Sequence, residues 1–310
     1  MTMEMRQVYA DTLIQLAEKD ENVVVLEADL MAAHATRRFL EKFPARTFNV
    51  GVAEANMVGV ACGLSASGKI PFAASFAPFV TRRAYDQFFV SANYARLNVK
   101  LMGSDPGVTA EYNGGTHMPF EDVGLMRNIP GLVVFEPADC VSLKKLLVQS
   151  ANHKGNTYMR MHRGSAPVVY SPEDEINLGK ANILKDGRDI TLIACGVVMV
   201  NEALKAAQIL SQDGISAAVI DMHTIKPLDE KTVLDYANKT KGIVTCENHQ
   251  IMNGLGSAVA EFLSENRPTI VKRIGINDEF GEVGDLDYLM ERFGLTAGHI
   301  CKKAKEILTN

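Results

Sequence analysis

The sequence predicts an α/β protein with two doubly wound domains, on three observations. Short apolar runs of strand length alternate with helical patterns along the chain. A polar stretch at residues 171–188 interrupts this alternation, which then resumes. The 310 residues are enough for two domains with sizeable cores. We therefore expect one domain at 1–172, a linker at 173–188 and a second domain at 189–310.

Composition and charge exclude several classes of protein. Hydrophobic residues make up 47% of the chain and charged residues 22%, as in ordinary soluble proteins. The net charge of -5 and the lack of a basic run argue against a nucleic-acid partner. No run of about 18 apolar residues predicts a membrane span, and the N-terminus lacks the apolar core of a signal peptide. Five cysteines without a CxxC pair indicate reduced thiols, so we expect a cytoplasmic protein.

The first domain is expected to start with an amphipathic helix at residues 4–19, because its apolar residues recur at helical spacing. Five apolar runs of strand length follow. These strands are expected at residues 23–26, 70–74, 99–102, 133–135 and 158–161. The second domain repeats the pattern, with strands expected at 190–195, 217–221, 243–246 and 271–274, and helices at 199–212 and from about 298.

One acid stands out within residues 48–94. Glu54 has no charged neighbour in sequence between Arg46 and Lys69. Gly51 allows a tight turn from a strand into a helix that starts near Ala53. Burial at such a place favours the protonated form of a carboxyl group, which suits proton donation. The alternative is that Glu54 only complements the helix dipole.

The helix that follows Glu54 carries Gly59 and Gly63 four residues apart. That spacing predicts a helix packed on both sides, because it lets another backbone approach closely. Downstream, Phe76, Phe79 and Arg82 are spaced by threes, and a helix is expected to continue to residue 94. Aromatic residues at this spacing are more often core than a cofactor platform. An acid followed one strand later by two aromatics and an arginine is a rarer combination.

This stretch resembles the pyrimidine-binding domain of thiamine diphosphate enzymes of the transketolase group. The resemblance implies that Glu54 bonds the ring nitrogen of the cofactor's aminopyrimidine and acts as a catalytic residue. It implies that Phe76 and Phe79 line and stack on that ring. Arg82 stands where many transketolases have tyrosine and is similar to 1-deoxyxylulose-5-phosphate synthase there, as is the run RRAYDQF. Arg82 is therefore expected to bind the cofactor too.

Asp29 follows the strand at 23–26, at the carboxyl end where open α/β sheets place ligands. It also matches the Asp of the transketolase ADL motif, which implies a place near the cofactor. The alternative is an N-cap for a helix at residues 34–43. His34 could face the substrate, but we expect a surface histidine.

The glycine-rich loop after the strand at 99–102 is a place to look for binding residues. Its GGTH motif is similar to the family's GPTH or GQTH, which implies that His117 contacts substrate oxygens or moves protons. Ser104 stands where transketolases often have a second substrate-binding histidine. Asn113 stands where an Asp usually contacts a sugar hydroxyl. These two departures leave the cofactor chemistry possible and put the usual sugars in doubt.

Two arginines lie in and just after the strand at 158–161. Arg160 and Arg163 are spaced as in deoxyxylulose phosphate synthase, and Arg163 also matches a transketolase arginine that holds the sugar phosphate. The planar guanidinium fork suits phosphate oxygens. The alternative is a surface salt bridge. The second domain is similar to the transketolase C-terminal domain, mainly structural in the family, so no catalysis is assigned to His223 or His249.

Family enzymes bind the cofactor's diphosphate and Mg²⁺ through a GDG motif, which this sequence lacks. No segment is left over for the domain that carries it. The resemblance therefore implies half of a split transketolase. Thiamine diphosphate would be shared with an N-terminal subunit that binds Mg²⁺, in an α2β2 heterotetramer acting on sugar phosphates, with no metal site in this chain.

Three other interpretations stay open. Deoxyxylulose phosphate synthase is normally one long chain. A 2-oxoacid dehydrogenase β subunit is naturally split, but GGTH with Arg163 is more similar to a sugar phosphate site. A non-catalytic scaffold or regulatory subunit of the same fold is the third. The scaffold interpretation is disfavoured by the joint occurrence of Glu54, Phe76, Phe79 and His117.

Overall fold

A seven-stranded sheet organises the N-terminal half of the protein, whose computed structural model describes residues 3–309. The strand order is β10-β5-β6-β4-β3-β1-β2, and all neighbours are parallel except β10 and β5. The central strands are buried on both faces, which explains their continuous apolar sequences. The parallel strands are β1 (Val23–Glu27), β2 (Thr47–Asn49), β3 (Ile70–Phe76), β4 (Lys100–Ser104), β5 (Val133–Phe135) and β6 (Thr157–Met161).

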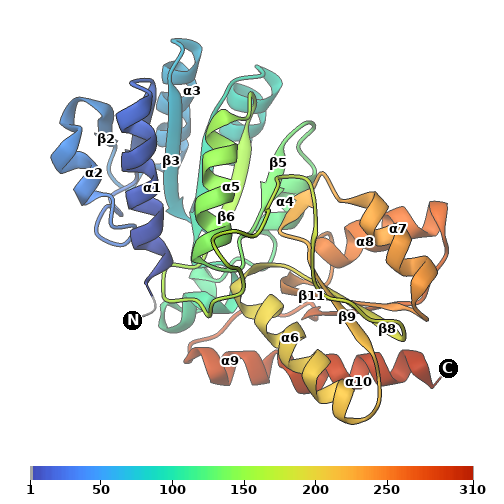
Figure 1. Cartoon of the computed structure of the whole chain (residues 1–310). Coiled ribbons are helices and arrows are strands. Elements are labelled where there is room, and N and C mark those ends of the chain that lie inside the picture. The colour runs from blue at the N-terminus through green and yellow to red at the C-terminus, as the bar shows by residue number, and fades with distance from the viewer. Residues whose placement is uncertain (1–2, 310) are drawn as a thin grey trace.

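Helices cover both faces of this sheet (Figure 1). On one face, α1 (Met5–Lys19) and α5 (Cys140–Asn152) pack in a core with Phe72 and Phe135. On the other face, α3 (Glu54–Ala66) and α4 (Asp122–Arg127) pack with the remaining strand side chains. The expected helix at 4–19 and the five expected strands are therefore confirmed, with shifts of one or two residues at their ends.

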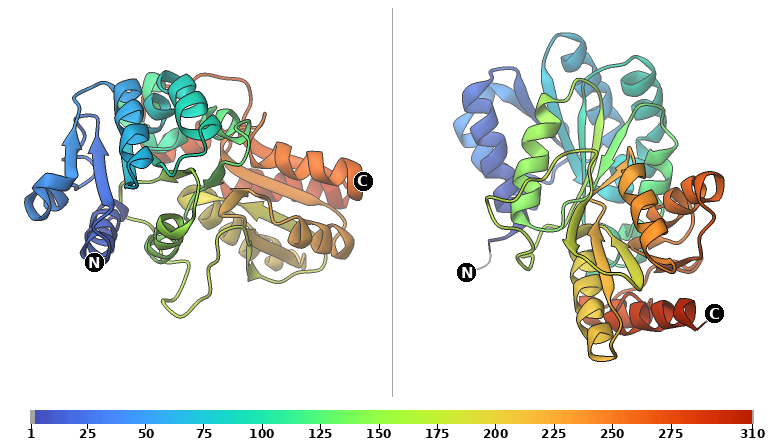
Figure 2. Two further views of the ribbon diagram at one scale, coloured as in Figure 1. Left: turned by 90° about the horizontal axis from the view of Figure 1, so that it is seen from above. Right: turned by 45° about the vertical axis from the view of Figure 1, so that its right-hand side comes forward.

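The second sheet has five strands in the order β12-β11-β8-β9-β7 and lies beside the first (Figure 2). It is parallel except for β7, which runs antiparallel to β9. One face is covered by α6 and α10, and the other by α7 and α8. The strands are β7 (Asn182–Lys185), β8 (Ile190–Ala194), β9 (Ala217–Asp221), β11 (Ile243–Gln250) and β12 (Val271–Ile276). The helices are α6 (Gly196–Gln212), α7 (Glu230–Lys239), α8 (Leu255–Asn266), α9 (Leu286–Arg292) and α10 (Ala297–Leu308).

Two strands cross the boundaries that the sequence predicted. The expected linker at 173–188 contains β7, which forms an edge of the second sheet. The expected second domain contributes β10 (Thr224–Lys226) to the first sheet, where it pairs with β5. Backbone hydrogen bonds between β10 and β5 therefore tie the expected second domain to the first sheet. Within residues 3–309, no helix combines the length and apolar character needed to cross a membrane.

Two helices differ from their predictions near the site. The expected helix at 34–43 is shorter, because only α2 (Arg37–Lys42) is regular and residues 31–36 form turns; a short 3₁₀ turn (Pro44–Arg46) follows it. The expected helix that ends at residue 94 is instead two π-helical segments, η2 (Phe79–Arg83) and η3 (Gln87–Tyr94). Segments of this wide type occur often at functional sites.

Candidate functional site

Glu54 is the first residue of α3 and is almost fully buried. The turn before it depends on Gly51, whose φ of +75° is unfavourable for other residues. The Ser75 hydroxyl donates to Glu54 Oε1 at 3.1 Å, and Arg83 Nη1 donates to Oε2 at 2.7 Å. Glu54 therefore has no charged neighbour along the sequence, but in the folded chain Arg83 is its charged neighbour.

Phe76 ends β3, Phe79 begins η2, and the rings pack edge to face with their centroids 6.1 Å apart. The imidazole of His117 lies 5.7 Å from the Phe76 ring and 5.0 Å from the Phe79 ring. The Arg83 guanidinium lies over the Phe79 ring, 4.4 Å from its centroid, and also contacts Glu54. The structure thus gathers Glu54, both predicted aromatics and His117 around one place.

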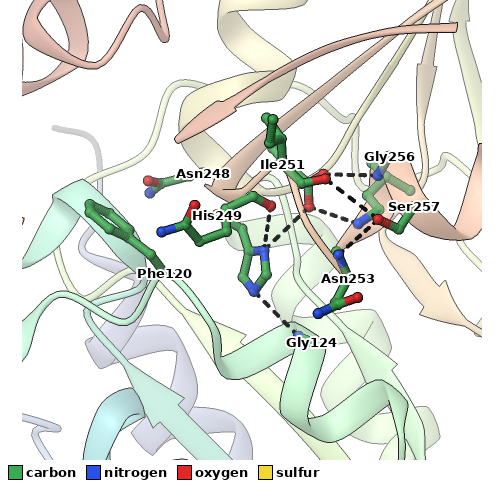
Figure 3. Close-up of polar contacts among 12 residues, drawn as sticks. Phe120, Gly124, Asn248, His249, Ile251, Asn253, Gly256 and Ser257 are labelled. Carbon is green, nitrogen blue, oxygen red and sulfur yellow. Dashed lines mark hydrogen bonds and ion pairs between the residues drawn. The ribbon is translucent and has the colours of Figure 1, made fainter. Parts of the chain in front are cut away.

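The second domain holds the loop that carries His117. This loop consists of two 3₁₀ segments, Gly107–Asn113 and Gly115–His117. The Asn248 side chain, near the end of β11, accepts from Val108 N at 2.9 Å and donates to the Pro106 carbonyl at 2.8 Å. Figure 3 shows Asn248 and His249 beside Phe120 and Gly124 of the first domain.

Two more contacts hold the segment that follows the loop. Gln250 N donates to the Phe120 carbonyl at 2.8 Å. Gly124 N donates to His249 Nε2 at 3.3 Å (Figure 3). Burial lowers the pKa of His249 to about 4, so the ring is neutral and can accept this bond.

Arg82 and its neighbour Arg83 point to different partners. Arg82 Nη2 donates to the Thr116 carbonyl at 3.0 Å, and Arg82 Nε pairs with Glu121 at 2.9 Å. Arg82 therefore braces the His117 loop, whereas Arg83 contacts the central carboxylate. Sequence reasoning named Arg82 and missed Arg83, although the run RRAYDQF contains both.

Asp29 is exposed at the end of β1 and has a φ of +64°. Its carboxylate accepts from Asn49 Nδ2 at 3.2 Å, and its backbone N–H donates to Asn49 Oδ1 at 3.0 Å. The helix-cap interpretation of Asp29 is wrong, because α2 begins eight residues later, at Arg37, after Thr36. Asp29 thus stays available at the edge where the strands end.

A buried polar chain runs from β1 to Arg163. His34 Nδ1 lies 2.8 Å from Glu27 Oε2, and His34 Nε2 lies 3.0 Å from Ser104 Oγ. Ser104 Oγ donates to Asp105 Oδ2 at 2.8 Å, and Arg163 Nε donates to Asp105 Oδ1 at 2.7 Å. The prediction of a surface His34 is wrong, since its side chain is fully buried. Ser104 is also fully buried, so it links this chain rather than facing a substrate.

Arg163 reaches a cavity of about 340 Å³ beside this chain. Its guanidinium lies 5.3 Å from the Phe76 ring, which connects the cavity to the aromatic pair. Asn113 lines the same cavity, and its contact with a substrate stays a prediction. The other lining residues are Glu4, Arg6, Asp105, Thr109, Ala110, Glu111, Tyr112, His162 and Gly164. A larger cavity near η3 contains none of the predicted site residues.

Arg160 is a correction to the predicted substrate-binding set. Its side chain is fully buried and bonds both oxygens of Asp122 at 2.8 and 3.1 Å. Its Nη1 donates to Glu136 at 2.8 Å, and its Nη2 also donates to the Asn248 carbonyl at 3.0 Å. A guanidinium with these partners links the two domains and has no free edge for a substrate phosphate.

Residues 1–168 match the pyrimidine-binding domain of transketolase, and residues 179–300 match the transketolase C-terminal domain. The chain belongs to the transketolase family. That family and its deoxyxylulose phosphate synthase relatives imply dependence on thiamine diphosphate. The buried carboxylate with two edge-to-face aromatics fits the aminopyrimidine end of this cofactor, because it offers one acceptor and apolar ring contacts.

Several relatives cover almost all of the chain. The 6-deoxy-6-sulfo-D-fructose transketolase subunit SqwH of a Clostridium species is 52% identical, over 98% of this chain and 94% of its own. A putative transketolase C-terminal section of Methanocaldococcus jannaschii is 44% identical, over 97% and 95%. A solved split-gene transketolase, described as an inactive β4 tetramer, is 39% identical with a TM-score of 0.91, over 100% and 99%.

Proposed function

We propose that this chain is the C-terminal subunit of a two-chain transketolase that transfers a two-carbon ketol unit from a ketose to an aldose. The observation that carries the proposal is the buried Glu54 carboxylate beside Phe76, Phe79 and His117. These are the groups that family resemblance assigns to the pyrimidine ring and to the substrate. Family membership supports the chemistry, and the two-carbon transfer is our inference.

The site residues have different roles in this proposal. When bound, thiamine diphosphate supplies the carbon nucleophile that accepts the two-carbon unit. Glu54 holds a proton at the pyrimidine ring nitrogen, and Phe76 and Phe79 fix the plane of that ring. His117, against both aromatics, binds substrate oxygens or moves a proton to them. Asp29, at the same edge, is proposed to contact the cofactor. Arg82, which lies in η2, is proposed to act at the cofactor site from its contact with the His117 loop.

A partner chain is part of the proposal. We expected α3 to be packed on both sides, yet its Gly59 and Gly63 are exposed, and a Cβ at either position would meet nothing within 4 Å. Val52, just before α3, has a relative exposure of 72%. An N-terminal subunit that binds the diphosphate and Mg²⁺ is proposed to cover this face, in an α2β2 heterotetramer. The inactive β4 assembly of the split-gene relative supports the need for another chain.

The substrate is proposed to be a ketose with an anionic group. One similar subunit is named for 6-deoxy-6-sulfo-D-fructose. Another, an apulose-4-phosphate transketolase subunit of Phocaeicola vulgatus, is 36% identical over 98% of this chain. Both names describe sugars with an acidic substituent, and Arg163 in its cavity supplies a matching cation. Asn113, on the wall of that cavity, is proposed to bind a sugar hydroxyl.

The test is reconstitution with the partner subunit. The two chains are purified together, supplied with Mg²⁺ and thiamine diphosphate, and assayed for ketol transfer, with each chain alone as a reference. Glu54→Gln is expected to keep the assembly and lower kcat by about 100-fold or more. Glu41→Gln, an exposed glutamate on α2, is the control. Full activity of Glu54→Gln contradicts the proposed role. Decarboxylation of 2-oxoacids without ketol transfer favours the dehydrogenase alternative, and formation of deoxyxylulose phosphate favours the synthase.

A further inference from the structure

Two arginines line the cavity of about 340 Å³, and each is held by a carboxylate through its Nε. Arg163 Nε donates to Asp105 at 2.7 Å, and Arg6 Nε donates to Glu4 at 2.7 Å. The two arginines are also adjacent, because Arg6 N donates to the Arg163 carbonyl at 3.2 Å. Among residues 3–309, the terminal nitrogens of both guanidinium groups make no hydrogen bond. They are therefore ready to bind an oxyanion.

The cavity nevertheless contains more carboxyl groups than guanidinium groups. Three acids line it: Glu4, Asp105 and Glu111. Burial is the main cause that raises the pKa of Glu111, and the nearby charges of Asp105 and Asp285 add to it. Burial lowers the pKa of His162, which favours the neutral form of that ring. The positive charges of Arg6 and Arg163 are thus largely balanced by the carboxylates of Glu4 and Asp105.

Asp105 is the most firmly fixed of these acids. Its carboxylate is 4% exposed, with one oxygen bonded to Arg163 and the other to Ser104. Its φ of +58° holds the backbone in the left-handed region. Its charge therefore stays within one hydrogen bond of the guanidinium that an anionic substrate would meet.

The class of anion follows from this balance. A phosphate monoester carries between one and two negative charges at pH 7, because its second pKa is about 6, whereas a sulfonate carries one. The first charge of either group is attracted by Arg6 and Arg163. The second charge of a phosphate meets cations that are already balanced and is repelled by Asp105. A difference of about tenfold or more is expected for one such charge interaction a few ångströms away, in a partly buried site.

Resting on the proposed function, we infer that Asp105 selects a ketose donor whose terminal group is a monoanion of the sulfonate class over one with a phosphate dianion. The proposal adds a specificity residue to a site that sequence reasoning had assigned to sugar phosphates. The name of the relative that is 52% identical, which contains 6-deoxy-6-sulfo-D-fructose, agrees with it. The selectivity itself depends on the pairing of Asp105 with Arg163.

Asp105→Asn is the informative variant, because it removes the charge and keeps the contacts. The amide oxygen can still accept from Arg163 Nε, and the amide nitrogen can donate to Ser104 Oγ. Ser104 can then donate to His34 Nε2, so no polar group of the chain is left without a partner. Asparagine also tolerates the positive φ of this position.

The experiment compares two donors in the assembled two-chain enzyme with one aldose acceptor. The donors are 6-deoxy-6-sulfofructose and fructose 6-phosphate, and the readout is the ratio of their kcat/KM values. Wild type is expected to prefer the sulfonate by about tenfold or more. Asp105→Asn is expected to lower this ratio by about tenfold, mainly by improving the phosphate reaction. Glu111→Gln, from the same cavity, is expected to move the ratio in the same direction by less.

Asp235→Asn is the charge-matched control, because Asp235 is an exposed residue of α7 that pairs with Lys231. The ratio of kcat/KM values for the two donors in Asp235→Asn should equal that of wild type. A wild-type enzyme that prefers the phosphate overturns the inference and leaves the proposed transketolase function standing. Equal losses for both donors in Asp105→Asn also overturn it, because Asp105 would then only position Arg163. No transfer from either donor overturns the proposed function and the inference with it.

Discussion

At the scale of single residues, two arginines adjacent in sequence contact different acids near the site. Arg83 donates to the Glu54 carboxylate and lies over the Phe79 ring, whereas Arg82 pairs with Glu121. Arg83 is 48% exposed, so its ion pair adds little to stability and mainly orients the carboxylate. The consequence is that neighbouring substitutions should have different kinetic effects.

Arg83→Met is expected to lower kcat of the assembled enzyme by about tenfold or more, because Glu54 loses one of the two bonds that orient it. Arg82→Met is expected to raise KM more than it lowers kcat, because the loop of His117 loosens. Steady-state kinetics of both variants at saturating cofactor measure the contrast. Identical kcat and KM changes in the two variants would count against this division.

His223 allows a prediction about pH. It is buried, with Nε2 on Asn182 at 3.2 Å and Nδ1 on Thr224 at 3.0 Å, and burial lowers its pKa to about 4. Between pH 6.5 and 4 the unfolded chain binds the proton and the folded chain does not, so this histidine's contribution to stability is full above pH 6.5 and is lost as the pH falls.

His223→Gln should therefore weaken the pH dependence of stability. Between pH 7.5 and 5, wild type is expected to lose about 2 kcal/mol more unfolding free energy than the variant. Urea denaturation of the isolated chain at both pH values measures this difference. Asp221 and Glu247, whose pKa values burial raises to about 8 and about 7, act in the opposite direction in both proteins. Parallel curves for wild type and variant would refute the assignment.

At the scale of elements, the end of β11 holds the loop that carries His117. The Asn248 side chain bonds both Pro106 and Val108, and no Cβ fits at Gly107, because it would lie 2.0 Å from Asn248 Oδ1. The second domain thus holds the loop that carries His117 through the side chain of Asn248.

Asn248→Ala should loosen this loop, since two buried backbone groups lose their partners at a cost of about 1–3 kcal/mol each. Hydrogen exchange of the amides at 107–117 is expected to rise, and kcat/KM to fall by about tenfold. Asn266→Ala, an exposed position at the end of α8, is the matched control. Unchanged exchange at 107–117 in Asn248→Ala would show that the loop is held by other contacts.

The sequence predicts those elements whose signal is local. The buried parallel strands contain continuous apolar runs, even the three-residue β5 (VVF), so their positions were predictable. The missed strands β2 (TFN), β7 (NILK) and β10 (TIK) are short and have polar residues at both ends. The aromatic pair and His117 were found through motifs. The burial of His34 was not, because it depends on Ser104, 70 residues away. Spacing along the chain also does not show which of Arg82 and Arg83 contacts Glu54. It does not show that Arg160 pairs with Asp122 either.

At the scale of the whole molecule, the helix that begins at Glu54 has an exposed face. Glu54 is buried at the start of α3, and the same helix exposes Gly59 and Gly63 along one side. The isolated chain gains little from glycine at these positions, because both have helical backbone angles and open space around them. Glycine inside an exposed helix is destabilising by about 0.5–1 kcal/mol relative to alanine. The residues are therefore best explained by close approach of another chain.

Gly63→Leu separates folding from assembly. The isolated variant is expected to keep its fold and to gain up to about 1 kcal/mol of stability, because leucine is a better helix former than glycine. Assembly with the N-terminal subunit, and with it ketol transfer, is expected to fail, because the leucine side chain fills the space for the partner backbone. Size-exclusion chromatography of the mixed chains and thermal denaturation of the single chain measure the two effects. Ser211→Leu, at an exposed position near the end of α6, is the control that should assemble normally. Normal assembly of Gly63→Leu would place the partner on a different face and leave the exposed glycines without a role.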